Sequence, residues 1–311
     1  MNQYVLSLSY GKDSLACLGA IEKLGWPLDR IVHAEIWATD TISADLPPMV
    51  EFKHKADALI KERYGIEVEH ISAVRGGEQD TYERRFYGIL QSGKFPGTIK
   101  GFPLTIGGWC KHLKYGSNID LRKDILQENP NPAGQDLRLP HEKGKLVQFR
   151  PQEGSTAKGH EVFSESPVPQ GTDKYTVVQY LGIASDEPIR LKRLDGVTKI
   201  SPLAAIGWTE ADAKQWCVEN NLLSPIYTTA TRGGCWFCHN QGVDQLRQLR
   251  KNYPDLWALL MKWDTDSPVS FHSDGKTVHD FDRRFQMEDE GKVPTDRKFR
   301  WKMIERGGKQ C

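Results

Sequence analysis

The sequence has no long apolar run and no excess of charge of either sign. No segment of its 311 residues approaches the roughly 18 consecutive apolar residues of a membrane span. The chain also begins without the basic stretch and cleavage site of a signal peptide. Lysine and arginine number 42 and aspartate and glutamate 41, so no global field attracts nucleic acid or anionic lipid. We therefore expect a cytoplasmic protein with no membrane partner.

Cysteine is also scarce. Six cysteines, unevenly spaced, are too few for a disulfide scaffold in a chain of this length. In a reducing compartment the close pair Cys235 and Cys238 instead indicates a metal site, an iron–sulfur cluster or a redox pair. With 38% hydrophobic and 10% aromatic residues, the composition is typical of a folded protein and not of a disordered one.

Strands and helices alternate near the N-terminus, which predicts the fold class. Apolar runs predict strands over residues 4–8, 31–37, 66–71 and 175–183. The first helix carries Cys17 on its apolar face and ends at Gly25. The second begins at Pro47-Pro48 and ends at Gly65, with an apolar side formed by Met49, Phe52, Ala56 and Leu59. This alternation predicts an α/β fold of the Rossmann type, a parallel twisted sheet with helices on both faces and ligands at the carboxyl ends of its strands.

The pattern also predicts two domains. Residues 1–200 form an α/β nucleotide-binding domain, in which the Pro-, Gly- and charge-rich segment 129–173 is a surface insertion. Residues 201–311 form a mostly helical part that contains the Cys-x-x-Cys pair. A capping box at Thr209 opens one of its helices, and a longer helix over 243–263 is kinked or broken at Pro254.

The turn that joins the first strand to the first helix has the composition of a phosphate site. It reads Ser9-Tyr10-Gly11-Lys12-Asp13-Ser14. Backbone N–H groups and the positive end of the helix dipole meet there, and Lys12 adds positive charge. Asp13 would orient the turn or help to coordinate Mg²⁺. The spacing excludes a Walker A loop. The alternative is a glycine turn in which Asp13 and Ser14 cap the helix. We expect both residues to sit at a surface-facing turn.

This turn resembles the PP-loop of the adenine nucleotide α-hydrolase-like superfamily. Further segments, in the same order as in the phosphoadenosine phosphosulfate (PAPS) reductase family, extend the resemblance to about residue 240. They are Gly108–Lys114, Leu181–Arg190, Pro202, Trp208-Thr209 and Arg232–Cys238.

The resemblance implies an enzyme that binds ATP or an adenylyl compound with Mg²⁺ and releases pyrophosphate and AMP. It implies catalytic roles for Lys12 and Asp13, with adenine beside the end of the second strand. The implied nucleotide-binding residues are Ser7, Ser9, Tyr10, Gly11, Lys12, Asp13, Ser14, Ile36, Trp37, Lys114 and Arg190. Arg232 is a further candidate for contact with an anion.

The chain departs from the sulfite-forming reductases of this family in two places. Their C-terminal Glu-Cys-Gly-Leu/Ile-His-like tail is replaced by a single terminal Cys311, and Trp109 stands where the cluster-bearing reductases have a second cysteine. The chain is therefore more similar to the DndC-type ATP pyrophosphatases of DNA phosphorothioation and to cluster-dependent tRNA thiolation enzymes. That likeness implies sulfur transfer to a nucleic-acid acceptor, with a sulfur donor such as a cysteine desulfurase.

Two other functions stay open. The chain could reduce PAPS or adenylyl sulfate, with Cys311 as the nucleophile. It could instead be a nucleotide-gated subunit that binds nucleic acid through its basic, aromatic tail at 297–306.

The resemblance places Cys110 near Cys235 and Cys238, which implies three thiolate ligands. Three thiolates and an open position suit a [4Fe–4S] cluster, whereas three thiolates and His112 or His239 suit zinc. A dithiol redox pair is the third alternative. Cys217 shares an apolar helix face and is interpreted as a core thiol.

Overall fold

The computed structural model describes most of the chain in two compact units. The described residues are 2–75, 77–91, 96–103, 108–111, 113, 145–151, 161–167, 176–194, 196, 199–228 and 234–295. Unit 1 comprises Met1–Glu35, Pro47–Gln79 and Leu113–Thr228, and unit 2 comprises Ile36–Leu46, Asp80–His112 and Thr229–Cys311. In the described residues, no helix has both the length and the apolar character that crossing a bilayer requires.

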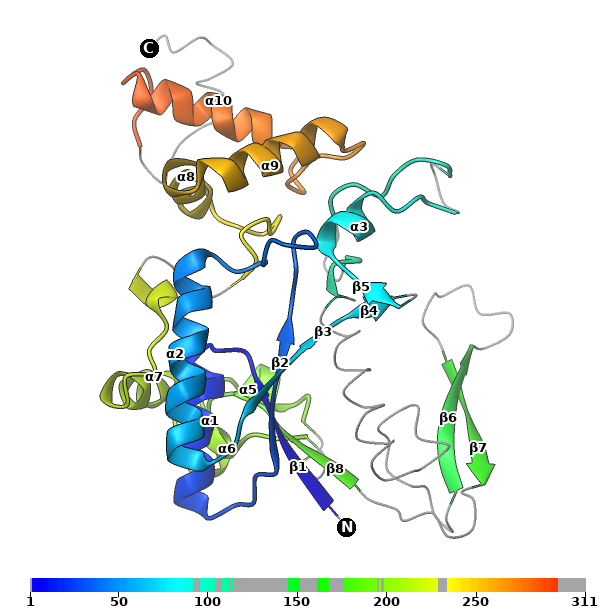
Figure 1. The fold of residues 1–311 in the computed structure, drawn as a ribbon, viewed down its shortest axis with the longest axis vertical. Helices are drawn as coiled ribbons and strands as arrows, with labels where there is room; N and C mark the ends of the chain where they lie inside the picture. Colours follow the sequence, from blue (N-terminus) through cyan, green and yellow to red (C-terminus); the bar gives the residue numbers. More distant parts are fainter. Residues whose placement is uncertain are drawn as a thin grey trace. The chain divides into compact units, whose positions relative to one another are not determined.

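Unit 1 contains a five-stranded sheet in the order β3-β2-β1-β8-β9, and every neighbouring pair is parallel (Figure 1). Its strands are β1 (Asn2–Leu8), β2 (Arg30–Glu35), β3 (Val68–Ser72), β8 (Thr176–Tyr180) and β9 (Lys199–Ile200). The predicted α/β class is confirmed. The second strand ends two residues earlier than predicted, because Trp37 leaves the sheet and forms an isolated bridge with Ser43.

The strand order reverses between β1 and β8. The chain runs from β1 outward to β2 and β3 and then returns to the other side of β1 as β8. In open parallel sheets, ligands bind at the carboxyl ends of the strands where the order reverses in this way. The turn that follows β1 and the turn that follows β8 both lie at that point.

Helices and short strands complete unit 1. They are α1 (Lys12–Leu24), α2 (Pro47–Tyr64), β4 (Val74–Arg75), β5 (Glu78–Gln79), α5 (Pro188–Leu191), α6 (Pro202–Ala205), α7 (Glu210–Glu219) and the 3₁₀ helix η2 (Pro225–Thr228). Gly25 ends α1 with a left-handed φ of 62°, and the predicted capping box at Thr209 opens α7. One predicted core position is wrong. Leu59 is 37% exposed, whereas Ile60 is fully buried, because the buried side of α2 is centred on Ala56 and Ile60.

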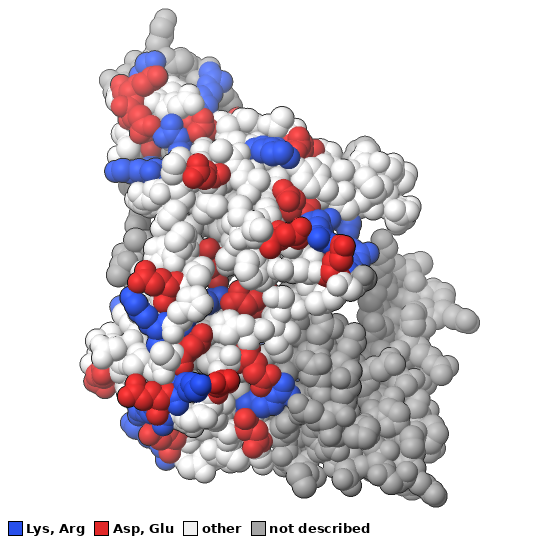
Figure 2. Space-filling view, in the orientation of Figure 1, with Lys and Arg blue, Asp and Glu red and all other residues white. Residues whose placement is uncertain are grey.

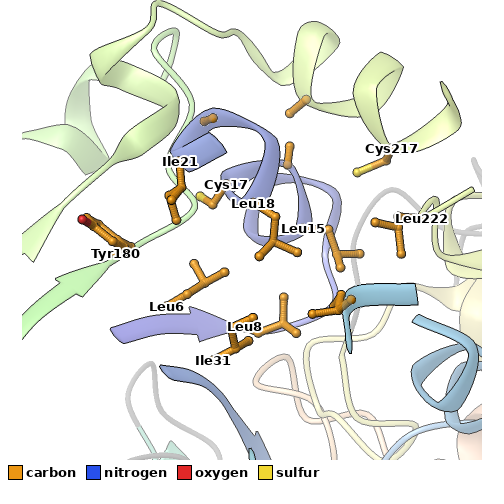
Figure 3. Close-up of a cluster of buried hydrophobic side chains, with 14 of the residues drawn as sticks. Leu6, Leu8, Leu15, Cys17, Leu18, Ile21, Ile31, Tyr180, Cys217 and Leu222 are labelled. Carbon is orange, nitrogen blue, oxygen red and sulfur yellow. The ribbon is translucent and has the colours of Figure 1, made fainter. Parts of the chain in front are cut away.

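The core of unit 1 lies around α1, which packs against α6 and α7. Gly19 permits close packing of α7, because a Cβ atom there would lie 2.2 Å from Nε1 of Trp216. Figure 3 shows the sulfur atoms of Cys17 and Cys217 among the aliphatic side chains of this core. Burial raises the pKa of Cys217 to about 12, so the thiol stays protonated at neutral pH.

Unit 2 is helical. It contains α3 (Tyr82–Phe86), α8 (Val243–Asn252), α9 (Pro254–Asp266) and α10 (Val278–Asp289), of which the last three pack on one another (Figure 1). The predicted helix over 243–263 is broken, because Asn252 ends α8 and Pro254 occupies the first turn of α9. Aromatic side chains form much of the core, including Trp236 and Trp263, which stack with ring centroids 5.6 Å apart.

The predicted insertion at 129–173 contains one described feature. Strands β6 (Lys145–Pro151) and β7 (Glu161–Pro167) pair antiparallel as a hairpin. The rest of that segment lies outside the described residues.

Candidate functional site

The turn between β1 and α1 offers backbone N–H groups to a ligand. Gly11 is the N-cap of α1 and has no side chain that could accept a hydrogen bond from the N–H groups of the first turn. The N–H of Lys12 donates to the hydroxyl of Tyr227 at 2.9 Å. The next two N–H groups, those of Asp13 and Ser14, have no acceptor among the described residues. Together with the positive end of the α1 dipole, they form a site suited to an anion such as a phosphate.

Two serines hold the turn in shape. The hydroxyl of Ser14 accepts the N–H of Ser9 at 3.1 Å and donates to the carbonyl of Gly11 at 3.0 Å. We expected Ser14 to face the surface, and this is wrong, since the residue is only 5% exposed. The alternative of a side-chain cap also fails in part, because Asp13 makes no capping hydrogen bond to α1. Ser14 therefore stabilises the turn from inside.

Three carboxylates gather beside the turn. Oxygens of Asp13, Glu187 and Glu210 all lie within 4.8 Å of one another. Nζ of Lys12 is 2.6 Å from Asp13 and 3.6 Å from Glu210. Arg190 forms an ion pair with Glu187 at 2.6 Å. Three negative side chains thus face two positive ones, and oxygen ligands in this arrangement are those that Mg²⁺ prefers.

These charges shift the pKa values of Lys12 and Asp13. Burial opposes charge on Lys12, but its hydrogen bond to Asp13 and the charges of Asp13 and Glu210 outweigh that effect and raise its pKa. Burial raises the pKa of Asp13, and Glu210 and Glu187 add to the rise while Lys12 counteracts it. A carboxylate crowded by other carboxylates gains stability from a bound cation, since the cation removes the repulsion.

Gly182 allows the turn after β8 to touch the turn after β1. A Cβ atom at this position would lie 2.5 Å from the backbone nitrogen of Ser14 and 2.7 Å from the carbonyl carbon of Asp13. Both neighbours are backbone atoms and cannot rotate away. The glycine is therefore required by the close approach of the two turns.

Replacing Gly182 with alanine is expected to lower the free energy of unfolding by about 1–3 kcal/mol, the usual cost of overpacking. Urea denaturation of both proteins measures the change. Gly242→Ala is the control, because a Cβ atom at Gly242 would meet nothing within 4 Å. An unchanged midpoint for Gly182→Ala would contradict the close approach of the two turns.

A polar network anchors Tyr10, the residue of the turn with a left-handed φ of 54°. Its side chain is fully buried, and its hydroxyl donates to Asp57 of α2 and lies 3.0 Å from Nε2 of His70 of β3. Non-glycine residues adopt this backbone conformation at a cost, which surrounding contacts must offset. The side chain of Tyr10, a predicted nucleotide contact, is thus engaged in holding the turn.

The same network contains a buried lysine. Nζ of Lys53 lies 2.7 Å from Nε2 of His33 and donates to Glu35 at 3.0 Å. Hydrogen bonds to Asp57 and Glu35 raise the pKa of His70 to about 9. Burial opposes charge on Glu35, but His70 and Lys53 outweigh it and lower its pKa to about 2. The ammonium group of Lys53 thus contacts both His33 and Glu35, two residues that could otherwise bind a metal ion.

The other predicted nucleotide contacts are dispersed. The hydroxyl of Ser7 accepts a hydrogen bond from Gln179 at 2.9 Å within the sheet. Arg190 lies beside the carboxylates, paired with Glu187. Ile36 and Trp37 belong to unit 2. Lys114 and Arg232 lie outside the described residues.

The three cysteines predicted as ligands belong to unit 2, on two segments held in place by tryptophans. Trp236, between Cys235 and Cys238, donates its indole N–H to the carbonyl of Ser43 at 2.9 Å. The N–H of Cys238 donates to the carbonyl of Cys235 at 3.0 Å, which closes the turn. Trp109, beside Cys110, donates its indole N–H to the carbonyl of Gly101 at 3.2 Å. Hydrogen bonds therefore position both segments.

Tyr82 marks the place where the two cysteine segments meet. Its ring centroid is 4.8 Å from that of Trp109 and 4.1 Å from that of Phe237. Burial raises its pKa, and negative charge on Cys110, Cys235 and Cys238 raises it further. The ring of Tyr82 therefore contacts neighbours of Cys110 and of Cys238.

The cysteine sulfurs are not crowded together. Within the described part of the chain, the groups of three ligand atoms that lie within 4.8 Å of one another are Asp13, Glu187 and Glu210, and His33, Glu35 and His70. The cysteines do not form such a group. Among the candidates for a fourth ligand, His239 is 9% exposed and burial lowers its pKa, so it is neutral at pH 7. His112 and Cys311 lie outside the described residues.

Several of these residues were not predicted as site residues. Glu187 lies within Leu181–Arg190, a segment that carries part of the resemblance, and Glu210 directly follows Thr209, but neither was singled out as a ligand. His33 and His70 have no ligand spacing, and Tyr82 and Tyr227 belong to no motif that we identified.

The surface charge is mixed on the face shown in Figure 2. Acidic and basic side chains of the described residues are interspersed there, which agrees with their nearly equal numbers in the sequence, 41 and 42. The basic segment at 297–306 lies outside the described residues.

Comparison of the chain with models of known protein families finds no match, and comparison with curated proteins finds none.

Proposed function

We propose that this protein is a PP-loop enzyme of the PAPS reductase type. It binds ATP or a related adenylyl compound at the turn between β1 and α1, releases pyrophosphate and AMP, and supports sulfur transfer through an iron–sulfur cluster. One observation carries the proposal. The N–H groups of Asp13 and Ser14, which have no acceptor among the described residues, belong to the same turn as Asp13, whose carboxylate lies close to those of Glu187 and Glu210. An anion and a cation site lie side by side at the topological switch point.

The charges favour a nucleotide with its metal ion over a bare anion. The three carboxylates would repel a polyphosphate, whereas Mg²⁺ held by them would attract it. In the proposed reaction, a nucleophile attacks the α-phosphorus, the bond to the β-phosphate oxygen breaks, and pyrophosphate leaves. Lys12 and the N–H groups would stabilise the negative charge on the leaving group. Asp13 would orient both Lys12 and the metal ion.

The donor set of unit 2 fits an iron–sulfur centre. Thiolates are the ligands that such clusters need, and the hydroxyl of Tyr82 is buried beside them without a hydrogen-bond partner. Three thiolates can also serve as ligands of zinc. The iron–sulfur cluster is preferred here because of the resemblance of the sequence motifs. Cys110, Cys235 and Cys238 would hold the cluster, which supplies a position for binding a sulfur species.

The last step of the proposed reaction transfers sulfur to an acceptor. Adenylylation by ATP would activate an oxygen of the acceptor, and a sulfide-level nucleophile would then displace AMP and form the carbon–sulfur or phosphorus–sulfur bond. Nucleic acid is the proposed acceptor, and an enzyme such as a cysteine desulfurase is the proposed source of sulfur. Both follow from the resemblance of the sequence motifs.

The test is product analysis with anaerobically purified protein. Incubation with ATP and Mg²⁺ should yield AMP and pyrophosphate in equal amounts, because the α–β bond is cleaved. Formation of ADP and phosphate would contradict the proposal. Incubation with PAPS and thioredoxin provides the second arm, in which release of sulfite would support the reductase function. Binding of nucleic acid with no turnover of ATP would favour the nucleotide-gated subunit.

A further inference from the structure

The hydroxyl of Tyr82 is a buried polar group that no described residue satisfies. Tyr82 is 1% exposed, and its oxygen has no hydrogen-bond partner. Buried hydroxyls nearly always have a partner, because removing one from water without replacement is costly. Tyr82 is one of six described residues with such an atom, and its hydroxyl is the one that belongs to a ring in contact with both cysteine segments.

The position of the ring is well defined. Tyr82 begins α3, where Thr81 caps the helix and the N–H of Tyr82 donates to the carbonyl of Trp37 at 2.8 Å. Its ring also packs against Trp263, with centroids 5.2 Å apart. The hydroxyl is consequently held in place and is not a mobile group that could find a partner elsewhere.

The ring of Tyr82 lies against both cysteine segments. Trp109 and Phe237, which contact the ring, are the sequence neighbours of Cys110 and Cys238. A phenol, whose ordinary pKa is about 10, keeps its proton at neutral pH. A protonated phenol beside thiolates is a hydrogen-bond donor beside sulfur acceptors.

We propose that Tyr82 is a positioning residue that donates its O–H to a sulfur of the centre held by Cys110, Cys235 and Cys238. This inference rests on the proposed iron–sulfur function and adds a residue outside the cysteine motifs. Such a hydrogen bond withdraws electron density from sulfur and stabilises the reduced state more than the oxidised state. Hydrogen bonds to the sulfurs are among the factors that set the reduction potential of a cluster.

The experiment compares the midpoint potentials of anaerobically purified holoprotein and of Tyr82→Phe. We expect the variant to retain its iron and to shift its redox equilibrium about tenfold toward the oxidised state, a midpoint about 59 mV more negative for one electron. Tyr87→Phe is the matched control. Tyr87 directly follows the same helix, and its hydroxyl donates to Asp266 at 2.5 Å and not to sulfur. The midpoint of Tyr87→Phe should therefore be unchanged.

The outcomes separate this inference from the proposed function. Wild-type protein without iron contradicts the proposed cluster and, with it, the role of Tyr82. Wild-type protein with iron and an unchanged midpoint in Tyr82→Phe contradicts the hydrogen bond alone. If Tyr82→Phe does not fold, replacing tyrosine by 3-fluorotyrosine in the wild-type chain tests the same bond. The more acidic phenol should then raise the midpoint, and an unchanged midpoint overturns the inference.

Discussion

Replacing Cys235 with serine is expected to remove most of the iron bound to anaerobically purified protein. Serine keeps the size of the side chain, but its hydroxyl is a hard and weakly acidic ligand that does not replace a thiolate on iron. The same result is expected for Cys238→Ser and Cys110→Ser, because all three thiolates are proposed ligands of the cluster. Iron analysis and the visible absorption spectrum measure the loss.

Cys217→Ser is the control for these variants. Cys217 is fully buried in the core of unit 1, and its thiol donates to the carbonyl of Lys12 at 3.2 Å. A serine hydroxyl can make the same hydrogen bond, so iron content should stay at the wild-type level. If Cys217→Ser bleaches the protein as fully as Cys235→Ser does, its assignment as a core thiol is wrong and the cluster has a fourth protein ligand.

Replacing Asp13 with alanine is expected to slow the release of AMP and pyrophosphate by about 100-fold or more, the scale on which catalytic electrostatic groups act. The variant loses one of the three carboxylates of the candidate cation site and the partner that orients Lys12 at 2.6 Å. Asp13→Asn should show a similar loss, since it keeps the shape and removes the charge. Turnover of ATP under saturating Mg²⁺ provides the measurement.

Glu22→Gln is the matched control on the same helix. Glu22 lies in the last turns of α1 and pairs with Arg63 at 2.6 Å on the surface, so its charge should not affect turnover. Circular dichroism should show that all three variants are folded. Turnover at the wild-type rate in folded Asp13→Ala would mean that the loop is a structural glycine turn. Ser14→Ala is a poorer probe, because that hydroxyl holds the turn together.

Some features of the fold were predictable from local sequence signals, and others were not. The end of α1 and the opening of α7 were predictable because glycine and capping signals act within a few residues of the helix end. The break at Pro254 is equally local. The exposure of Leu59 was not predictable, because residues at the edge of an apolar face are buried or exposed according to what packs against the helix.

The sequence by itself determined the class of the fold and the location of two candidate sites. Alternating apolar strands and amphipathic helices specify a parallel sheet, and both the PP-loop-like turn and the Cys-x-x-Cys pair are contiguous in the chain. Only the tertiary structure decided what surrounds them. It brought Glu187 and Glu210 beside Asp13, packed Gly182 against the turn, and placed the ring of Tyr82 against Trp109 and Phe237 of the two cysteine segments. Those contacts join residues far apart in sequence, where neither periodicity nor local spacing carries information, because they arise from strand order and from packing.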